Sequence, residues 1–165
     1  MIALETRYGF HFDVRPATHQ DEAALAAFFA EVTDEDRRFR FLSAVRRLSD
    51  AQLHDIADFD HHRHETFLAF EPNGTEIIAA ATLAADKAGE TGEVAISIVP
   101  ALKGKGIGWT LLDHVAQEAR HWGVAKLQSI ESRENHAAIT LEREMGFTAR
   151  AVDGDPGLVL LERRF

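Results

Sequence analysis

The 165-residue chain contains no cysteine, only four prolines and a single tyrosine. Without cysteine it can form neither disulfides nor a thiolate metal site, and it has no cysteine nucleophile. No apolar run approaches the roughly 18 residues that cross a bilayer, and Met1–Arg7 lacks the long apolar stretch of a signal peptide. We therefore expect a cytoplasmic protein without a membrane-spanning segment.

Basic residues are also scarce, with 18 Lys and Arg against 27 Asp and Glu and a net charge of −9. Nucleic acids and anionic membranes are bound through basic surfaces, so the composition argues against both as partners. Lysine occurs only four times, and Lys103 and Lys105 fall in one glycine-rich loop. The length and the ordinary balance of apolar and charged residues predict a single domain over residues 1–165.

The spacing of apolar and turn-forming residues predicts alternating strands and helices. The predicted strands are 10–15, 65–70, 76–84, 93–99, 125–130, 147–152 and 158–162, and the predicted helices are 22–31, 50–58, 109–122 and 135–145. Residues 33–42, which are mostly charged, are predicted to form a turn. This order indicates an α/β mixture with an antiparallel meander in its middle.

The loop Lys103-Gly-Lys-Gly-Ile-Gly108 lies between a predicted strand and a predicted helix. Glycines let successive N–H groups converge, and the N-terminus of the following helix adds positive potential, which suits a pyrophosphate. The loop is neither a P-loop nor a dinucleotide fingerprint, because Trp109 stands where those motifs need Ser or Thr and the third Gly. A plain glycine turn is the alternative from the loop alone.

A second motif begins about 30 residues later and reads Asn135-His-Ala-Ala138-Ile-Thr-Leu-Glu142-Arg-Glu-Met-Gly-Phe147. Together the two segments resemble the GNAT acetyltransferase superfamily, whose second motif is N-x-x-A-x-x-L-Y-x-x-x-G-F. Lys103 stands where that superfamily usually has Gln or Arg. The stretch 37–42, Arg-Arg-Phe-Arg-Phe-Leu, further resembles the acetyltransferase domain of bacterial protein lysine acetyltransferases. The resemblance extends over about residues 14–165.

This resemblance implies an α+β fold with a mixed, mostly antiparallel sheet of about six to seven strands and about four helices. It also implies that acetyl-CoA is the co-substrate, with no metal. The pantetheine arm would lie between strands 93–99 and 125–130, and a backbone N–H near Ile98 or Val99 would polarise the thioester carbonyl. The residues implied to bind acetyl-CoA are Ile98, Val99, Lys103, Gly104, Lys105, Gly106, Ile107, Gly108, Asn135 and Ala138.

Direct attack by an amine requires a base, because a lysine-like amine is almost fully protonated at pH 7. Glu93 opens the strand that leads to the glycine loop, at a place where the lysine acetyltransferases it resembles carry base carboxylates. Its strand face also carries Ala95 and Ser97, so we expect Glu93 to be desolvated and thereby a stronger base. A solvated carboxylate at the strand entrance is the alternative.

The superfamily's tyrosine, which protonates the leaving thiolate, is replaced by Glu142, and the only tyrosine of the chain is Tyr8. Because Glu142 lies beside Arg143 and Glu144, it is predicted to be a solvated helix carboxylate. A buried Glu142 acting as the acid is the alternative. A thiolate can also leave without a dedicated acid, because thiol pKa values lie near 8.5.

The cluster 58–64 contains carboxylates and imidazoles and is predicted to be a solvated turn, with Zn²⁺ binding around His61–His64 as the alternative. Arg37, Arg38 and Arg40 could meet carboxylates, an acidic acceptor or the CoA 3′-phosphate. The predicted function is acetyl-CoA-dependent N-acetylation of a primary amine, either a protein lysine or a small molecule. A non-catalytic acyl-CoA sensor on the same fold is the alternative.

Overall fold

The computed structural model of the chain describes residues 1–41, 49–57 and 63–165, which contain eight strands, five α-helices and two short 3₁₀ turns. The strands are β1 (Ile2–Glu5), β2 (His11–Pro16), β3 (His64–Phe70), β4 (Ile77–Ala85), β5 (Thr91–Ile98), β6 (Lys126–Ser132), β7 (Thr148–Val152) and β8 (Asp155–Arg164). The helices are α1 (Glu22–Glu31), α2 (Asp34–Phe41), α3 (Asp50–Ala57), α4 (Ile107–His121) and α5 (His136–Glu144), and the 3₁₀ turns are η1 (His19–Asp21) and η2 (Pro100–Leu102).

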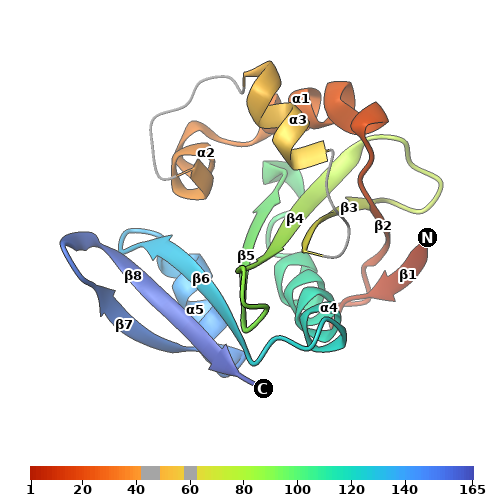
Figure 1. Cartoon of the computed structure of the whole chain (residues 1–165). Coiled ribbons are helices and arrows are strands. Elements are labelled where there is room, and N and C mark those ends of the chain that lie inside the picture. The colour runs from red at the N-terminus through yellow and green to blue at the C-terminus, as the bar shows by residue number, and fades with distance from the viewer. Residues whose placement is uncertain (42–48, 58–62) are drawn as a thin grey trace.

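The strands form one sheet in the order β1-β2-β3-β4-β5-β6-β8-β7. Among the described strands only β5 and β6 are parallel neighbours, and α4 is the crossover that such a pair requires. Their pairing stops at Glu93 opposite Gln128, although β5 continues to Ile98 and β6 to Ser132. The two strands therefore diverge, and Figure 1 shows the sheet opening between them.

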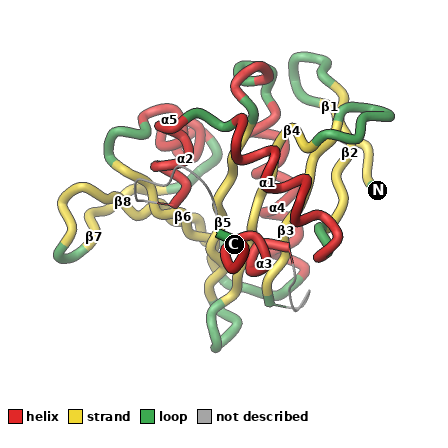
Figure 2. Tube along the Cα trace, turned by 90° about the horizontal axis from the view of Figure 1, so that it is seen from above, coloured by secondary structure: helices red, strands yellow, loops and turns green. Residues whose placement is uncertain are grey.

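The core lies around the central strands, which are covered on both faces. Successive residues Glu65–Phe70 of β3 and Ile77–Ala81 of β4 are all buried, and successive side chains of a strand point to opposite faces. Helices α1 and α4 both pack against β4, and α3 packs on α1. Viewed from above, α2 and α5 lie on the β6–β8 side of the molecule, whereas α1, α3 and α4 gather around β3 and β4 (Figure 2).

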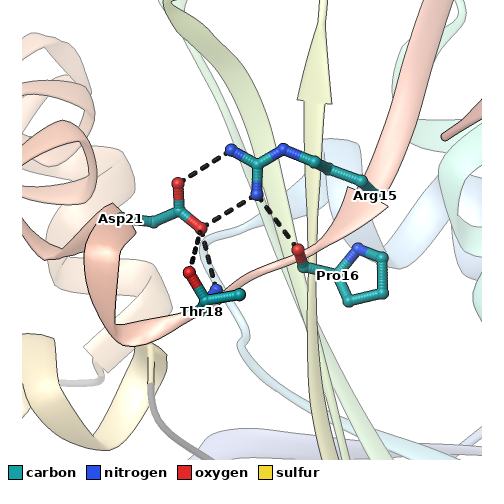
Figure 3. A network of polar contacts seen from close by, with 4 residues as sticks. All are labelled: Arg15, Pro16, Thr18 and Asp21. Atoms are coloured by element: carbon teal, nitrogen blue, oxygen red, sulfur yellow. Dashed lines mark hydrogen bonds and ion pairs between the residues drawn. The ribbon is translucent and has the colours of Figure 1, made fainter.

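A polar network joins the end of β2 to the start of α1 (Figure 3). Asp21 accepts hydrogen bonds from both terminal guanidinium nitrogens of Arg15, at 2.8 and 2.9 Å, and from the backbone N–H of Thr18 at 2.8 Å. The hydrogen bond from Arg15 is the main reason that the pKa of Asp21 lies below its ordinary value. The network thus ties the end of β2 to the residues that lead into α1.

The mixed, mostly antiparallel fold predicted from the sequence is confirmed, but two elements differ from prediction. The predicted charged turn is the helix α2, which begins after Thr33, whose Oγ1 accepts the N–H of Asp36 at 3.1 Å. The guanidinium of Arg37 in α2 is buried, and it donates to the carbonyl oxygens of Phe29 and Val32, at 2.7 and 2.8 Å. Arg37 therefore serves the carboxyl end of α1, which no local pattern reveals.

Strand β1 was not predicted at all. It has four residues with mostly exposed side chains, so it lacks the alternation that marks a half-buried strand. Its pairing with β2, from Ile2 opposite Val14 to Glu5 opposite His11, defines it instead. Within the described residues, no helix combines the length and apolar character that a membrane crossing would need.

Candidate active site

A cavity of about 400 Å³ opens where β5 and β6 diverge. Its walls come from β5, the glycine loop with the start of α4, β6 and α5, while α2 contacts both β5 and β6. Of the residues predicted to bind acetyl-CoA, those lining the cavity are Ile98, Lys103, Gly104, Gly106, Ile107, Gly108, Asn135 and Ala138. Val99, Lys105 and Glu93 are not among the described residues that line it.

The glycine loop leaves the start of α4 open to the cavity. Gly104 and Gly106 adopt left-handed conformations, with φ of 81° and 87°, which favour glycine. Gly106 is also crowded, because a Cβ there would lie 3.0 Å from the Tyr8 ring. Helix α4 begins at Ile107, two residues before the predicted start, and Gly106 supplies no side chain that could cap its first N–H groups. Such a helix start can bind an anion.

The edge of β5 presents unpaired backbone to the same cavity. The Val99 N–H donates to the carbonyl oxygen of Ile78 at 3.0 Å. Because hydrogen-bonded and non-bonded pairs alternate along antiparallel strands, Ile98, opposite Ala79, directs its N–H away from β4. Ile96 does the same two residues earlier, and β6 has already diverged there. Of the two predicted donors to a thioester carbonyl, Ile98 is therefore the one placed for it.

The two loop lysines differ in their surroundings. Both are exposed, but Lys103 forms an ion pair with Asp36 of α2, whereas Lys105 has no ion pair among the described residues. The turn between β1 and β2 adds Arg7 and Tyr8 beside the loop, with the Arg7 guanidinium 5.2 Å from the Tyr8 ring centroid and 5.9 Å from that of Trp109. Sequence reasoning missed Arg7 and Tyr8, because only the tertiary fold brings this turn to the loop.

Glu93 does not line the cavity but precedes Val94, which does, and lies at the last parallel pair before β5 and β6 diverge. Its side chain is exposed, so the expectation that this strand face desolvates it was wrong. The guanidinium of Arg40 is held near it by a 3.2 Å hydrogen bond to Thr82 Oγ1. Burial lowers the pKa of Arg40, while the charges of Glu93 and Glu131 oppose that shift.

Glu142 is buried, contrary to prediction, with 4% of its surface exposed. It lines the cavity four residues after Ala138, on the same face of α5, while Arg143 and Glu144 point to solvent. Its Oε1 has no hydrogen-bond partner among the described residues. Burial, followed by the charge of Glu131, raises the pKa of Glu142 to about 9. This direction favours the neutral, protonated form of Glu142.

Glu131 of β6 is held by two donors. Ser129 Oγ donates to its Oε1 at 2.6 Å and Asn135 Nδ2 to its Oε2 at 3.2 Å. Asn135 also caps α5 as predicted, because its Oδ1 accepts the N–H of Ala138 at 3.4 Å. Sequence reasoning missed Ser129 and Glu131, although their period-two spacing on β6 places both on one strand face.

The other polar clusters either have structural roles or include residues outside the described ranges. Arg37 is buried with an ion pair to Asp34, and Arg38 pairs with Glu134 at 3.3 Å. Residues 58–62 of the histidine cluster lie outside the described residues. Burial lowers the pKa of His64, with a smaller contribution from Arg40. Within the described part of the chain, no three His, Asp or Glu side chains are grouped as metal ligands would be.

Comparison with known proteins identifies this architecture. Residues 24–147 match the acetyltransferase (GNAT) family. The chain is 26% identical over 154 residues to an acetyltransferase of Pseudomonas aeruginosa, covering 92% of this chain and 83% of that protein. The crystal structure of the GNAT domain of PAT from S. lividans superposes with a TM-score of 0.91 at 27% identity, covering 99% of this chain and 96% of that one.

A third relative supports the fold alone. The spermidine N-acetyltransferase of Vibrio cholerae, solved with CoA and spermine, has a TM-score of 0.73 at 17% identity, covering 93% of this chain and 95% of that one. The family match itself spans most of the chain and both motifs that the cavity brings together. The chain therefore belongs to the acetyltransferase (GNAT) family and is an acetyltransferase that uses acetyl-CoA.

Proposed function

We propose that residues 1–165 form a single domain that transfers the acetyl group of acetyl-CoA directly to a primary amine. One observation carries this proposal: the open start of α4 and the unpaired edge of β5 meet in one cavity. The first suits a pyrophosphate, and the second suits an extended chain with amide groups. Both features belong to one elongated ligand such as acetyl-CoA.

In this proposal the loop from Lys103 to Gly108 binds the pyrophosphate through backbone N–H groups. The exposed edge of β5 pairs with the amides of the pantetheine arm, as an added strand would. The Ile98 N–H then polarises the thioester carbonyl and stabilises the oxyanion that forms on attack. Asn135 and Ala138 border the arm from the opposite wall.

Glu93 is the proposed general base. Its exposed side chain, one residue before Val94 of the cavity wall, supports this role, because an amine arriving from solvent can reach it. The base takes one proton from the ammonium group, so that the neutral amine can attack the carbonyl carbon. Arg40, held close by, fixes positive charge beside the carboxylate and helps to orient it.

A cationic amine is the proposed class of acceptor. The net charge of −9 favours attraction of cations, and the Vibrio cholerae relative is named for spermidine. A protein lysine is the finer proposal, supported by the segment 37–42 that resembles protein lysine acetyltransferases. A cytoplasmic location, proposed from the sequence, would supply both acetyl-CoA and such acceptors.

A turnover assay tests this function. Purified protein is incubated with acetyl-CoA and, in turn, a lysine-containing peptide, spermidine and a neutral alcohol, with and without a chelator. We expect release of CoA thiol with the amines, no release with the alcohol and no effect of the chelator. Tight acetyl-CoA binding with no turnover on any amine would favour the acyl-CoA sensor instead.

A further inference from the structure

Gln128 of β6 is a polar neighbour of Glu93, the proposed base. The two residues stand opposite each other in the last parallel pair of β5 and β6, so their side chains lie on the same face of the sheet. Adjacent strands lie about 4.8 Å apart, which places both side-chain ends within reach of one small group. Each is followed by a residue of the cavity wall, Val94 and Ser129.

The orientation of the Gln128 amide is set by Glu162 of β8. Glu162 stands opposite Gln128 on the other side of β6, and Gln128 Nε2 donates to its Oε2 at 2.8 Å. An ionised carboxylate can only accept hydrogen bonds, so the amide must turn its NH₂ group, and not its carbonyl oxygen, toward Glu162. The carbonyl oxygen of Gln128, Oε1, is therefore left to accept a hydrogen bond from another group.

Three cations favour the ionised form of Glu162. Lys126, Arg150 and Arg164 lie 3.5, 3.7 and 3.5 Å from its carboxylate oxygens. The hydrogen bond from Gln128 is the main reason that the pKa of Glu162 lies below its ordinary value, and the three cations act in the same direction, against the effect of burial. Glu162 therefore remains an acceptor at neutral pH, and the amide of Gln128 keeps its orientation.

Glu93 and Gln128 thus present two neighbouring acceptors without a donor. Among the described residues, neither the Glu93 carboxylate nor Gln128 Oε1 takes part in a hydrogen bond or an ion pair. The nearby guanidinium of Arg40 donates to Thr82 instead, at 3.2 Å. An ammonium group has three N–H donors and no acceptor, so one primary ammonium can satisfy both oxygens at once.

We propose that Gln128 binds the ammonium group of the acceptor together with Glu93, and that Glu162 is a positioning residue that holds the Gln128 amide in the orientation this requires. The proposal rests on the function proposed above and assigns a substrate-binding residue to it. After one proton has passed to Glu93, the neutral amine still donates an N–H to Gln128 while it attacks. An alcohol, which has a single O–H, cannot bind both acceptors, so the pair favours primary amines.

The test compares Gln128→Met with Gln117→Met. Met is similar in length to Gln but has only a weakly accepting sulfur. Loss of a hydrogen bond to a charged group should raise KM for spermidine or a lysine peptide about tenfold, with a smaller change in kcat and unchanged acetyl-CoA affinity in calorimetry. Gln117 of α4 donates in the same way to Asp113, at 3.0 Å, but does not line the cavity, so Gln117→Met should leave KM unchanged.

Glu162→Gln tests the positioning role without changing Gln128. A neutral amide at this position can donate as well as accept, so it no longer holds the Gln128 amide in one orientation. We expect KM for the amine to lie between the values of wild type and Gln128→Met, again with unchanged acetyl-CoA affinity. A wild-type KM in Glu162→Gln would overturn the positioning role. A wild-type KM in Gln128→Met, in an enzyme that acetylates amines, would overturn the binding role and leave the proposed function intact.

A measurement without turnover keeps the two proposals separate. In NMR spectra of isotope-labelled protein, the side-chain NH₂ signals of Gln128 and Gln117 are identified by their loss in the two Met variants. Titration of the CoA-bound wild type with spermidine should shift the Gln128 signals and leave those of Gln117 in place. No shift at Gln128 would overturn the ammonium site even if the enzyme acetylates amines. A shift in a wild type that acetylates no amine would overturn the proposed function and keep the ammonium site.

Discussion

The two walls of the cavity bring different chemistry to one place. The wall formed by β5 and the glycine loop offers mainly backbone groups, namely the edge at Ile98 and the open start of α4. The wall formed by β6 and α5 offers side chains, among them Glu131, Asn135 and Glu142. In the proposed function the first wall holds the pyrophosphate and the pantetheine arm, and the second borders the arm from the other side. Substitutions in each wall should therefore have separable effects.

The largest effect is expected in the backbone wall, from Gly106→Asp. The substitution places a side chain against Tyr8, strains a left-handed position and brings a negative charge to the proposed pyrophosphate site. We expect acetyl-CoA binding to be lost in calorimetry. Gly154→Asp, at another left-handed glycine in the turn between β7 and β8, controls for strain and should keep binding. Unchanged affinity in Gly106→Asp would remove the phosphate site from this loop.

Glu93→Gln should have the next largest effect, and it should affect the rate of acetyl transfer without affecting acetyl-CoA binding. Loss of a general base lowers kcat/KM by about 10²- to 10⁴-fold, while acetyl-CoA affinity should hardly change. The remaining activity should follow deprotonation of the free amine as pH rises. Glu90→Gln, an exposed carboxylate just before β5, is the matched control. Wild-type rates in Glu93→Gln at neutral pH would place the base elsewhere.

Asn135→Ala tests whether the side-chain wall does more than hold α5 in place. Loss of the cap should lower the free energy of unfolding by about 0.5–2 kcal/mol, measured by urea denaturation. Ser49→Ala removes a comparable cap from α3, where Ser49 Oγ accepts the Gln52 N–H at 3.1 Å. Both variants should lose similar stability, but only Asn135→Ala should also weaken acetyl-CoA binding, because Asn135 lines the cavity. An unchanged affinity for acetyl-CoA would reduce Asn135 to a cap.

The smallest effect is expected from Arg7→Gln, in the turn that the tertiary fold adds to the backbone wall. The exposed Arg7 guanidinium near the glycine loop should strengthen binding of the anionic cofactor. The variant should therefore bind acetyl-CoA roughly two- to fivefold more weakly, with a smaller difference at high salt. Calorimetry at two salt concentrations measures this change. Arg120→Gln, on the far end of α4 beside Phe165, should leave the affinity unaltered. An equal loss in both variants would indicate a general effect of charge.

Local patterns predicted most of the fold and the main features of the backbone wall. The glycine spacing of the loop, the amphipathic α4 and the cap at Asn135 all concern residues close in sequence, and each was found, with α4 beginning two residues early. The incorrect predictions share one cause, because each concerns residues that are held by partners on another strand or helix. Strand β1 exists through pairing with β2, and Arg37 becomes buried because the carbonyl groups at the end of α1 accept its hydrogen bonds.

The sequence by itself determined the mixed, mostly antiparallel architecture and the glycine-rich turn before α4, because glycine conformation, strand alternation and helix periodicity act over a few residues. Only the tertiary structure decided the state of the carboxylates. Glu93 has small neighbours on its own strand yet is exposed, whereas Glu142 lies among charges in the sequence yet is buried. Desolvation depends on what packs against a side chain from other elements, and burial of Glu142, together with the charge of Glu131 on β6, raises its pKa.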